Sequence, residues 1–70
     1  MRLDRIESDA LDGVAYDPEA HLLAVKFHDG GTYVYYDVDE EVYEELLAAQ
    51  PHPWAVVSEV VKSHRYHRVQ

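Results

Sequence analysis

The sequence has no cysteine, which excludes disulfide stabilisation and thiolate chemistry. It also lacks long apolar runs: the longest span a few residues, as at positions 54–57, against the roughly 20 that a membrane-spanning helix needs. Positions 1–7 alternate charged and apolar residues and contain no hydrophobic stretch of the secretory type. We therefore expect no membrane segment and a cytoplasmic location.

Basic residues are scarce, with six Lys and Arg against 14 Asp and Glu, for a net charge of -8. Three of the six, Lys62, Arg65 and Arg68, lie in residues 62–70, where no acidic residue stands. That segment carries +3 and residues 1–61 carry -11. An acidic body repels polyanions, so RNA is a disfavoured partner except at the basic tail.

The chain of 70 residues has no Gly-, Ser- or Pro-rich stretch that would divide it, so we expect a single domain over residues 1–70. A chain this short buries only about 60% of its extended surface. Good packing, a metal or self-association must therefore support the fold.

Three segments predict strands joined by tight turns. Residues 12–16 form an apolar run that ends at Asp17-Pro18, where proline favours a type I turn and the aspartate can bond its backbone. Residues 22–28 alternate apolar and polar side chains, which is the pattern of a half-buried strand. Residues 29–31, Asp-Gly-Gly, suit a hairpin, and the β-branched and aromatic segment 32–36 follows. Two consecutive hairpins predict a three-stranded antiparallel meander.

The length of the second turn decides which tyrosines are buried. The apolar face of the second strand consists of Leu23, Val25 and Phe27. A two-residue turn would place Val34 and Tyr36 opposite that face, and a three-residue bulged turn would place Tyr33 and Tyr35 there. We favour the bulged turn because Tyr33 and Tyr35 bring more apolar surface to the core.

A helix is predicted from the acidic residues Asp37, Asp39, Glu40 and Glu41, which can cap free N–H groups, to about Gln50. Its apolar positions recur every three or four residues: Val42, Tyr43, Leu46, Leu47 and Ala49. Pro51 and Pro53 end it.

Pro53 is also suited to be the first residue of a second helix over residues 53–62. The four valines of this segment make a strand the alternative, although we favour the helix. Residues 64–69 are expected to form a short extended tail. The fold class is thus α+β, a meander followed by one or two helices and a tail.

The ordered features resemble those of the KTSC domain family, a domain found at the C-terminus of some lysyl-tRNA synthetases and as a stand-alone bacterial protein. The matching features are Leu23-x-Val25-x-Phe27, the two glycines, Tyr33-Val34-Tyr35, Val38 and Val42-Tyr43-Glu44-Glu45-Leu46-Leu47. The central mark is the tyrosine-x-tyrosine pair. The resemblance implies one KTSC-like domain, and the synthetase association suggests RNA binding. The chain departs from the family where Ser-x-Gly, Phe-Asn and Ile-Arg are common: it has Pro51-His52-Pro53, Val56-Val57 and Val60-Val61.

Our first hypothesis is a non-catalytic binding or interaction module. Its surface would be the sheet face around Lys26, His28, Tyr33 and Tyr35, together with the valine-rich segment 54–61. That segment offers more apolar width than one small sheet covers, which indicates a protein partner or self-association as a homodimer. Trp54 within it is expected to anchor the core, or alternatively to contact a partner.

The alternative is an RNA-binding accessory domain. Tyr33 and Tyr35 would stack on bases while Lys62, Arg65 and Arg68 neutralise phosphates. Three such contacts give a slope of only about -3 for the logarithm of the RNA affinity against the logarithm of the salt concentration, which indicates weak binding.

Catalytic and metal sites are not expected. Ser8, Ser58 and Ser63 have no glycine elbow around them. The acidic residues 39–45 suit a solvated helix start better than a cation loop, and His64-x-x-His67 would converge on a metal only in a helix. We therefore predict no enzyme activity, no cofactor and no bound metal.

Overall fold

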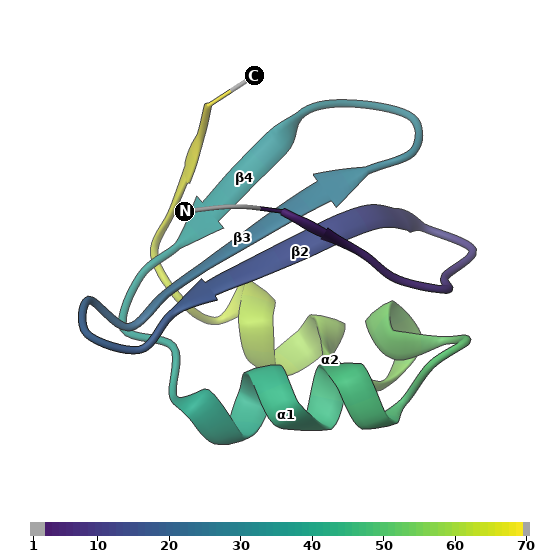
Figure 1. Cartoon of the computed structure of the whole chain (residues 1–70). Helices are drawn as coiled ribbons and strands as arrows, with labels where there is room; N and C mark the ends of the chain where they lie inside the picture. The colour runs from purple at the N-terminus through teal and green to yellow at the C-terminus, as the bar shows by residue number, and fades with distance from the viewer. Residues whose placement is uncertain (1–2, 70) are drawn as a thin grey trace.

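The computed structural model describes residues 3–69 as a five-stranded antiparallel sheet with two helices packed against one of its faces (Figure 1). The elements are β1 (Asp4–Arg5), β2 (Leu11–Asp17), β3 (Leu22–Phe27), β4 (Thr32–Tyr35), α1 (Glu40–Ala48), α2 (Pro53–Lys62) and β5 (Tyr66–Arg68). The strands lie side by side in sequence order, and both helices are inserted between β4 and β5. The α+β prediction is confirmed.

The predicted meander corresponds to β2, β3 and β4, with boundaries that differ by one residue at most ends. At the first turn the Asp17 carboxylate accepts hydrogen bonds from the backbone N–H groups of Glu19 and Ala20, at 3.0 and 3.3 Å. Two strands extend the sheet beyond the meander: β1, which the sequence did not predict, and β5, which forms from the predicted extended tail. The two edge strands of the sheet are therefore the first and the last strands of the described residues.

The register of β3 and β4 confirms the predicted facing of Tyr33 and Tyr35, although the turn closes one residue earlier than predicted, with the Phe27 N–H bonded to the Gly31 carbonyl oxygen at 3.2 Å. Leu23 pairs with Tyr35 and Val25 pairs with Tyr33, so both tyrosines share the apolar face of β3. Gly31 has a φ of 31°, a left-handed backbone value that residues with a Cβ rarely adopt. This glycine lets the turn set the register that brings the two tyrosines to the helix side.

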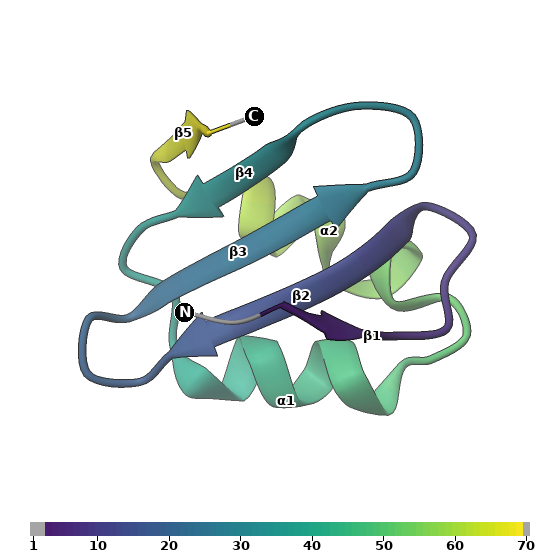
Figure 2. The ribbon, with the colours of Figure 1, turned by 45° about the horizontal axis from the view of Figure 1, so that its top comes forward.

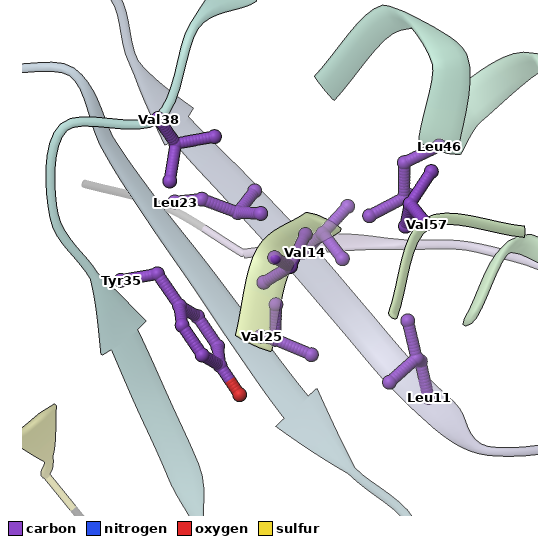
Figure 3. Close-up of a cluster of buried hydrophobic side chains, with 9 residues drawn as sticks. Leu11, Val14, Leu23, Val25, Tyr35, Val38, Leu46 and Val57 are labelled. Atoms are coloured by element: carbon purple, nitrogen blue, oxygen red, sulfur yellow. The ribbon is translucent and has the colours of Figure 1, made fainter. Parts of the chain in front are cut away.

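The core lies between the sheet and the two helices (Figure 3). Its members are all 5% exposed or less: Leu11, Val14, Leu23, Val25, Tyr35, Val38, Leu46, Val57 and Val61. In β3 the core residues alternate, α1 contributes Leu46, and α2 contributes Val57 and Val61, so one small layer of side chains joins the larger elements. Tyr35 stands at the β4 end of this layer, next to the surface region described below.

The start of α1 corrects one detail of the prediction. Asp39 is the N-cap residue, yet its side chain makes no capping hydrogen bond. Its carbonyl oxygen instead accepts the N–H of Val42 at 3.0 Å, and Glu40 and Glu41 place negative charge in the first turn. The acidic start thus acts through the helix dipole. The helix ends at Ala48, slightly before the predicted end near Gln50.

Residues 53–62 are helical, which decides the alternative that the sequence left open. Pro53 occupies the first turn of α2, as predicted. Val57 and Val61 are buried, whereas Val56 and Val60 are 54% and 50% exposed. Neither helix found within residues 3–69 has the length and apolar content that crossing a membrane requires.

Candidate functional site

A hollow opens on the surface between the β3–β4 turn, β4, β5 and α2. It lies at the edge of the sheet formed by β5, whose ribbon runs beside β4 in Figure 2. Its volume is about 760 Å³, within the range of small-ligand sites. We call it the aromatic hollow, and its lining residues are Phe27, Asp29, Gly30, Tyr33, Tyr35, Trp54, Lys62, Tyr66 and Arg68. Four separate segments of the chain therefore build one site.

The five rings of the aromatic hollow form a closed circuit of contacts. Phe27 packs edge-on against Tyr33 and Trp54, with centroid distances of 5.6 and 5.1 Å. Tyr66 lies 5.8 Å from both Tyr33 and Tyr35, and Tyr35 lies 6.4 Å from Trp54. All five distances fall in the range of favourable aromatic pairs. Each ring is thus held by two neighbours.

The circuit runs from the core to the solvent. Tyr35 is 5% exposed, whereas Tyr66 is 60% exposed. Burial is the main cause that raises the pKa of Tyr35, with smaller contributions from Tyr33 and Tyr66. Its hydroxyl therefore stays protonated at neutral pH and can donate a hydrogen bond. Tyr35 therefore forms the buried base of the hollow, and Tyr66 lies at its solvent-exposed rim.

Two cations stand over rings of the aromatic hollow. The Lys62 Nζ atom lies 6.0 Å from the centroid of the Trp54 ring, and the Arg68 guanidinium carbon lies 5.8 Å from that of Tyr33. These are cation–π distances. Asp29, in the β3–β4 turn, is the acidic residue among the lining residues. The hollow therefore has a positive balance within a chain whose net charge is -8.

The structure brings together four of the seven residues predicted to bind, namely Tyr33, Tyr35, Lys62 and Arg68. Arg65 lies outside the aromatic hollow, with its guanidinium 5.3 Å from the Tyr36 ring.

Lys26 and His28 lie elsewhere, lining a second hollow beside β1. Because successive residues of a strand point to opposite faces, Lys26 cannot share the face of its neighbour Val25, which is paired with Tyr33. The predicted single surface around Lys26, His28, Tyr33 and Tyr35 is therefore divided between the two faces of the sheet.

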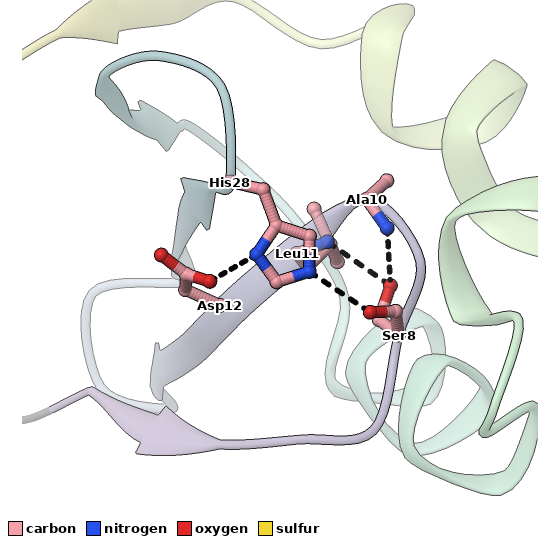
Figure 4. A network of polar contacts seen from close by, with 5 residues as sticks. All are labelled: Ser8, Ala10, Leu11, Asp12 and His28. Carbon is pink, nitrogen blue, oxygen red and sulfur yellow. Dashed lines mark hydrogen bonds and ion pairs between the residues drawn. The ribbon is translucent and has the colours of Figure 1, made fainter.

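His28 joins the loop before β2 to the β3–β4 turn (Figure 4). Its Nε2 contacts the Ser8 carbonyl oxygen at 3.0 Å and its Nδ1 contacts the Asp12 carboxylate. Both partners are acceptors, so the ring makes both contacts as donor only when it is protonated. The Ser8 carbonyl bond, followed by Asp12, raises the pKa of His28.

The grouping of Ser8, Asp12 and His28 contains the residue types of a hydrolase triad but not its geometry. The Ser8 hydroxyl oxygen accepts the N–H groups of Ala10 and Leu11, both at 3.1 Å, and His28 contacts the carbonyl oxygen instead. A nucleophile must be hydrogen-bonded to its base. This network therefore has a structural role: it holds the loop before β2 against the β3–β4 turn. Elsewhere among residues 3–69, no three His, Asp or Glu side chains gather as a metal site would need.

Sequence reasoning missed Tyr66 and Phe27 as site residues. The signal for Tyr66 was the alternation of the tail, in which Tyr66 and Arg68 fall on one side of a strand. Pairing with β4 places Tyr66 opposite Tyr35 and Arg68 opposite Tyr33, which completes the hollow. Trp54, expected either in the core or at a contact surface, is half-buried and touches both.

Comparison with known proteins matches the KTSC domain to residues 7–52, well over half of the chain. The chain belongs to the KTSC domain family. A protein of Tsukamurella paurometabola is 47% identical over 45 residues, covering 64% of this chain and 67% of that protein. An uncharacterised protein of Stutzerimonas stutzeri is 39% identical over 49 residues, covering 70% of this chain and 69% of the relative.

The crystal structure of a KTSC domain protein from Yersinia pestis has the same fold, with a TM-score of 0.90. It is 21% identical in sequence, and the superposition covers 99% of this chain and 97% of that one. The KTSC match at residues 7–52 includes Phe27, Tyr33 and Tyr35 of the aromatic hollow. The α2 and β5 walls of the hollow lie beyond the matched residues.

Proposed function

We propose that this KTSC domain is a non-catalytic binding module whose ligand site is the aromatic hollow. The observation that supports this proposal is the closed circuit of five rings that reaches the surface at Tyr66. Aromatic side chains in a concave surface supply most of the energy at many binding sites. A ligand that covers Tyr66 and Trp54 removes apolar area from water without reordering the fold, because neighbouring rings already fix both side chains.

The lining residues that the structure describes also support the proposal that the module is not an enzyme. They include no serine, threonine, cysteine or histidine. These lining residues therefore form no serine–histidine or cysteine–histidine pair of the kind that activates a nucleophile. We place the action of the module in the cytoplasm, as the sequence predicts.

A fragment titration tests the site. Small neutral aromatic compounds are added to ¹⁵N-labelled protein, and we expect chemical-shift changes at the Trp54 indole and the amides of β4 and β5. The Tyr66→Ser variant should weaken these changes. The matched control is Tyr36→Ser, since Tyr36 directly follows β4, contacts Arg65 and is not among the lining residues of the hollow. Changes that cluster at another surface, or that survive Tyr66→Ser unaltered, contradict the proposal.

RNA binding is the second candidate, favoured by the meeting of Tyr33, Tyr35, Lys62 and Arg68 in one hollow. Bases would stack on the rings while the two cations contact phosphates. With two phosphate contacts, the salt slope is only about -1.4 for a single strand. Titration with tRNA at low salt should then shift the hollow residues and lose the effect with added salt. An unchanged spectrum removes this candidate.

Self-association is a separate proposal for the exposed pair Val56 and Val60 on α2, which are not among the lining residues of the hollow. Light scattering after size exclusion checks it. A strictly monomeric species at high protein concentration contradicts a homodimer.

A further inference from the structure

The electrostatics of the aromatic hollow restrict its ligand. Lys62 and Arg68 already stand over the rings of Trp54 and Tyr33, so a cationic ligand would compete with the chain's own cations for the same rings. An anionic group is instead attracted to both. The hollow thus favours a ligand with negative charge beside an apolar or aromatic body.

The number of negative charges is also restricted. The body formed by residues 1–61 carries -11, and Asp29 lies in the wall of the hollow itself. A ligand with many phosphates meets this repulsion along its length, whereas a ligand with one carboxylate needs only the positive end of the site. A single charge therefore fits better than a polyanion.

The shape of the site suits a side chain. The hollow of about 760 Å³ is lined by five rings in edge-on and tilted contacts, with Tyr66 exposed at its rim. An inserted aromatic or large apolar side chain would find ring edges and faces at contact distance, as buried anchors do in protein interfaces.

We propose that the aromatic hollow binds a partner protein's segment in which an aromatic side chain stands next to a single carboxylate. The aromatic side chain contacts Tyr66 and Trp54, and the carboxylate pairs with Lys62 and Arg68. This inference rests on the proposed function, since it names the partner of the same site.

The test uses four probes with the full ¹⁵N-labelled chain in about 0.15 M salt, where surface charges are screened as in the cell. The acidic probe is acetyl-Gly-Glu-Trp-Gly-amide. Its Gln analogue removes the charge, its Ala analogue removes the ring, and hexauridylate represents RNA. We expect the acidic probe to bind about fivefold more tightly than the Gln analogue, as an exposed charge pair gives. The Ala analogue should show no saturable shifts.

Matched variants locate the charge effect. Arg68→Gln should bring the affinity for the acidic probe closer to that of the Gln analogue, with Lys62 keeping part of the difference. Arg5→Gln makes the same change on β1, at the opposite edge of the sheet, and should leave the affinity unchanged. Unfolding temperatures equal to that of the unchanged protein show that neither variant acts through the stability of the fold.

Three results overturn the inference. Equal binding of the acidic probe and its Gln analogue leaves the hollow as a ligand site but removes the carboxylate. Tighter binding of hexauridylate at the hollow assigns the site to RNA and likewise keeps the proposed function. Failure of every probe to shift Tyr33, Trp54 or Tyr66 rejects both the inference and the aromatic hollow as a ligand site.

Discussion

The two adjacent valines Val57 and Val56 of α2 should respond very differently to replacement by alanine. Val57 is 1% exposed and Val56 is 54% exposed, although both belong to the same helix turn. Val57→Ala removes two buried methyl groups, worth about 1.6 kcal/mol by transfer, and a cavity adds to this. Alanine's better helix propensity returns about 0.5 kcal/mol. We expect a net destabilisation of about 2 kcal/mol for Val57→Ala and a change within about 0.5 kcal/mol for Val56→Ala.

A 70-residue domain has a free energy of unfolding of roughly 4 to 10 kcal/mol, so both variants should fold. Urea denaturation followed by the fluorescence of Trp54, the chain's one tryptophan, measures the difference. For Val57→Ala we also expect a fall in Tm of about 8–16 °C. Equal destabilisation of the two variants would refute the assignment of inner and outer faces of α2. A loss for Val56→Ala that grows with protein concentration would instead reveal a dimer contact at that residue.

Three further perturbations follow from the structure. Gly13→Ala should detach β1, because a Cβ at this position would lie 2.9 Å from the Asp4 carbonyl oxygen. We expect faster hydrogen exchange of the β1 amides in this variant, and an unchanged exchange rate would contradict the prediction. Tyr16→Phe should cost about 1 kcal/mol in urea denaturation, since the hydroxyl donates a 2.5 Å hydrogen bond to the loop before α1, and an unchanged midpoint would count against that bond. The raised pKa of His28 means that its contribution to stability is complete below the ordinary value of about 6.5 and is lost as the pH rises through the folded-state pKa. NMR titration of the ring should show that raised pKa and its decrease in Asp12→Asn, and an ordinary pKa in both proteins would disprove the contact.

The elements that local chemistry specifies could be predicted from the sequence. The Asp17 turn, the alternation of β3 and the proline start of α2 each depend on neighbouring residues, and the structure confirms all three. The side of the sheet on which Tyr33 and Tyr35 lie was also predicted, from the geometry of the glycine turn together with a comparison of the apolar area that each register buries.

Features that depend on distant partners could not be predicted in the same way. The two residues of β1 have no strand pattern of their own, and they pair because Gly13 permits close approach. Likewise, the Tyr66 segment is a strand only because β4 offers it an edge. The aromatic hollow needs that pairing and α2 at once, so the sequence indicated four of its residues without showing that they meet.

The placement of β5 has a consequence for folding. Residues 36–65, which include both helices, separate β4 from its last partner, so this pairing closes a long loop, whereas the meander forms from neighbours. Until the loop closes, β4 is an open edge with unpaired backbone groups, and Tyr33 and Tyr35 lack their contacts with Tyr66. Chains that have not yet closed this loop expose the tyrosines that the finished domain holds in place, so refolding at high protein concentration favours aggregation there.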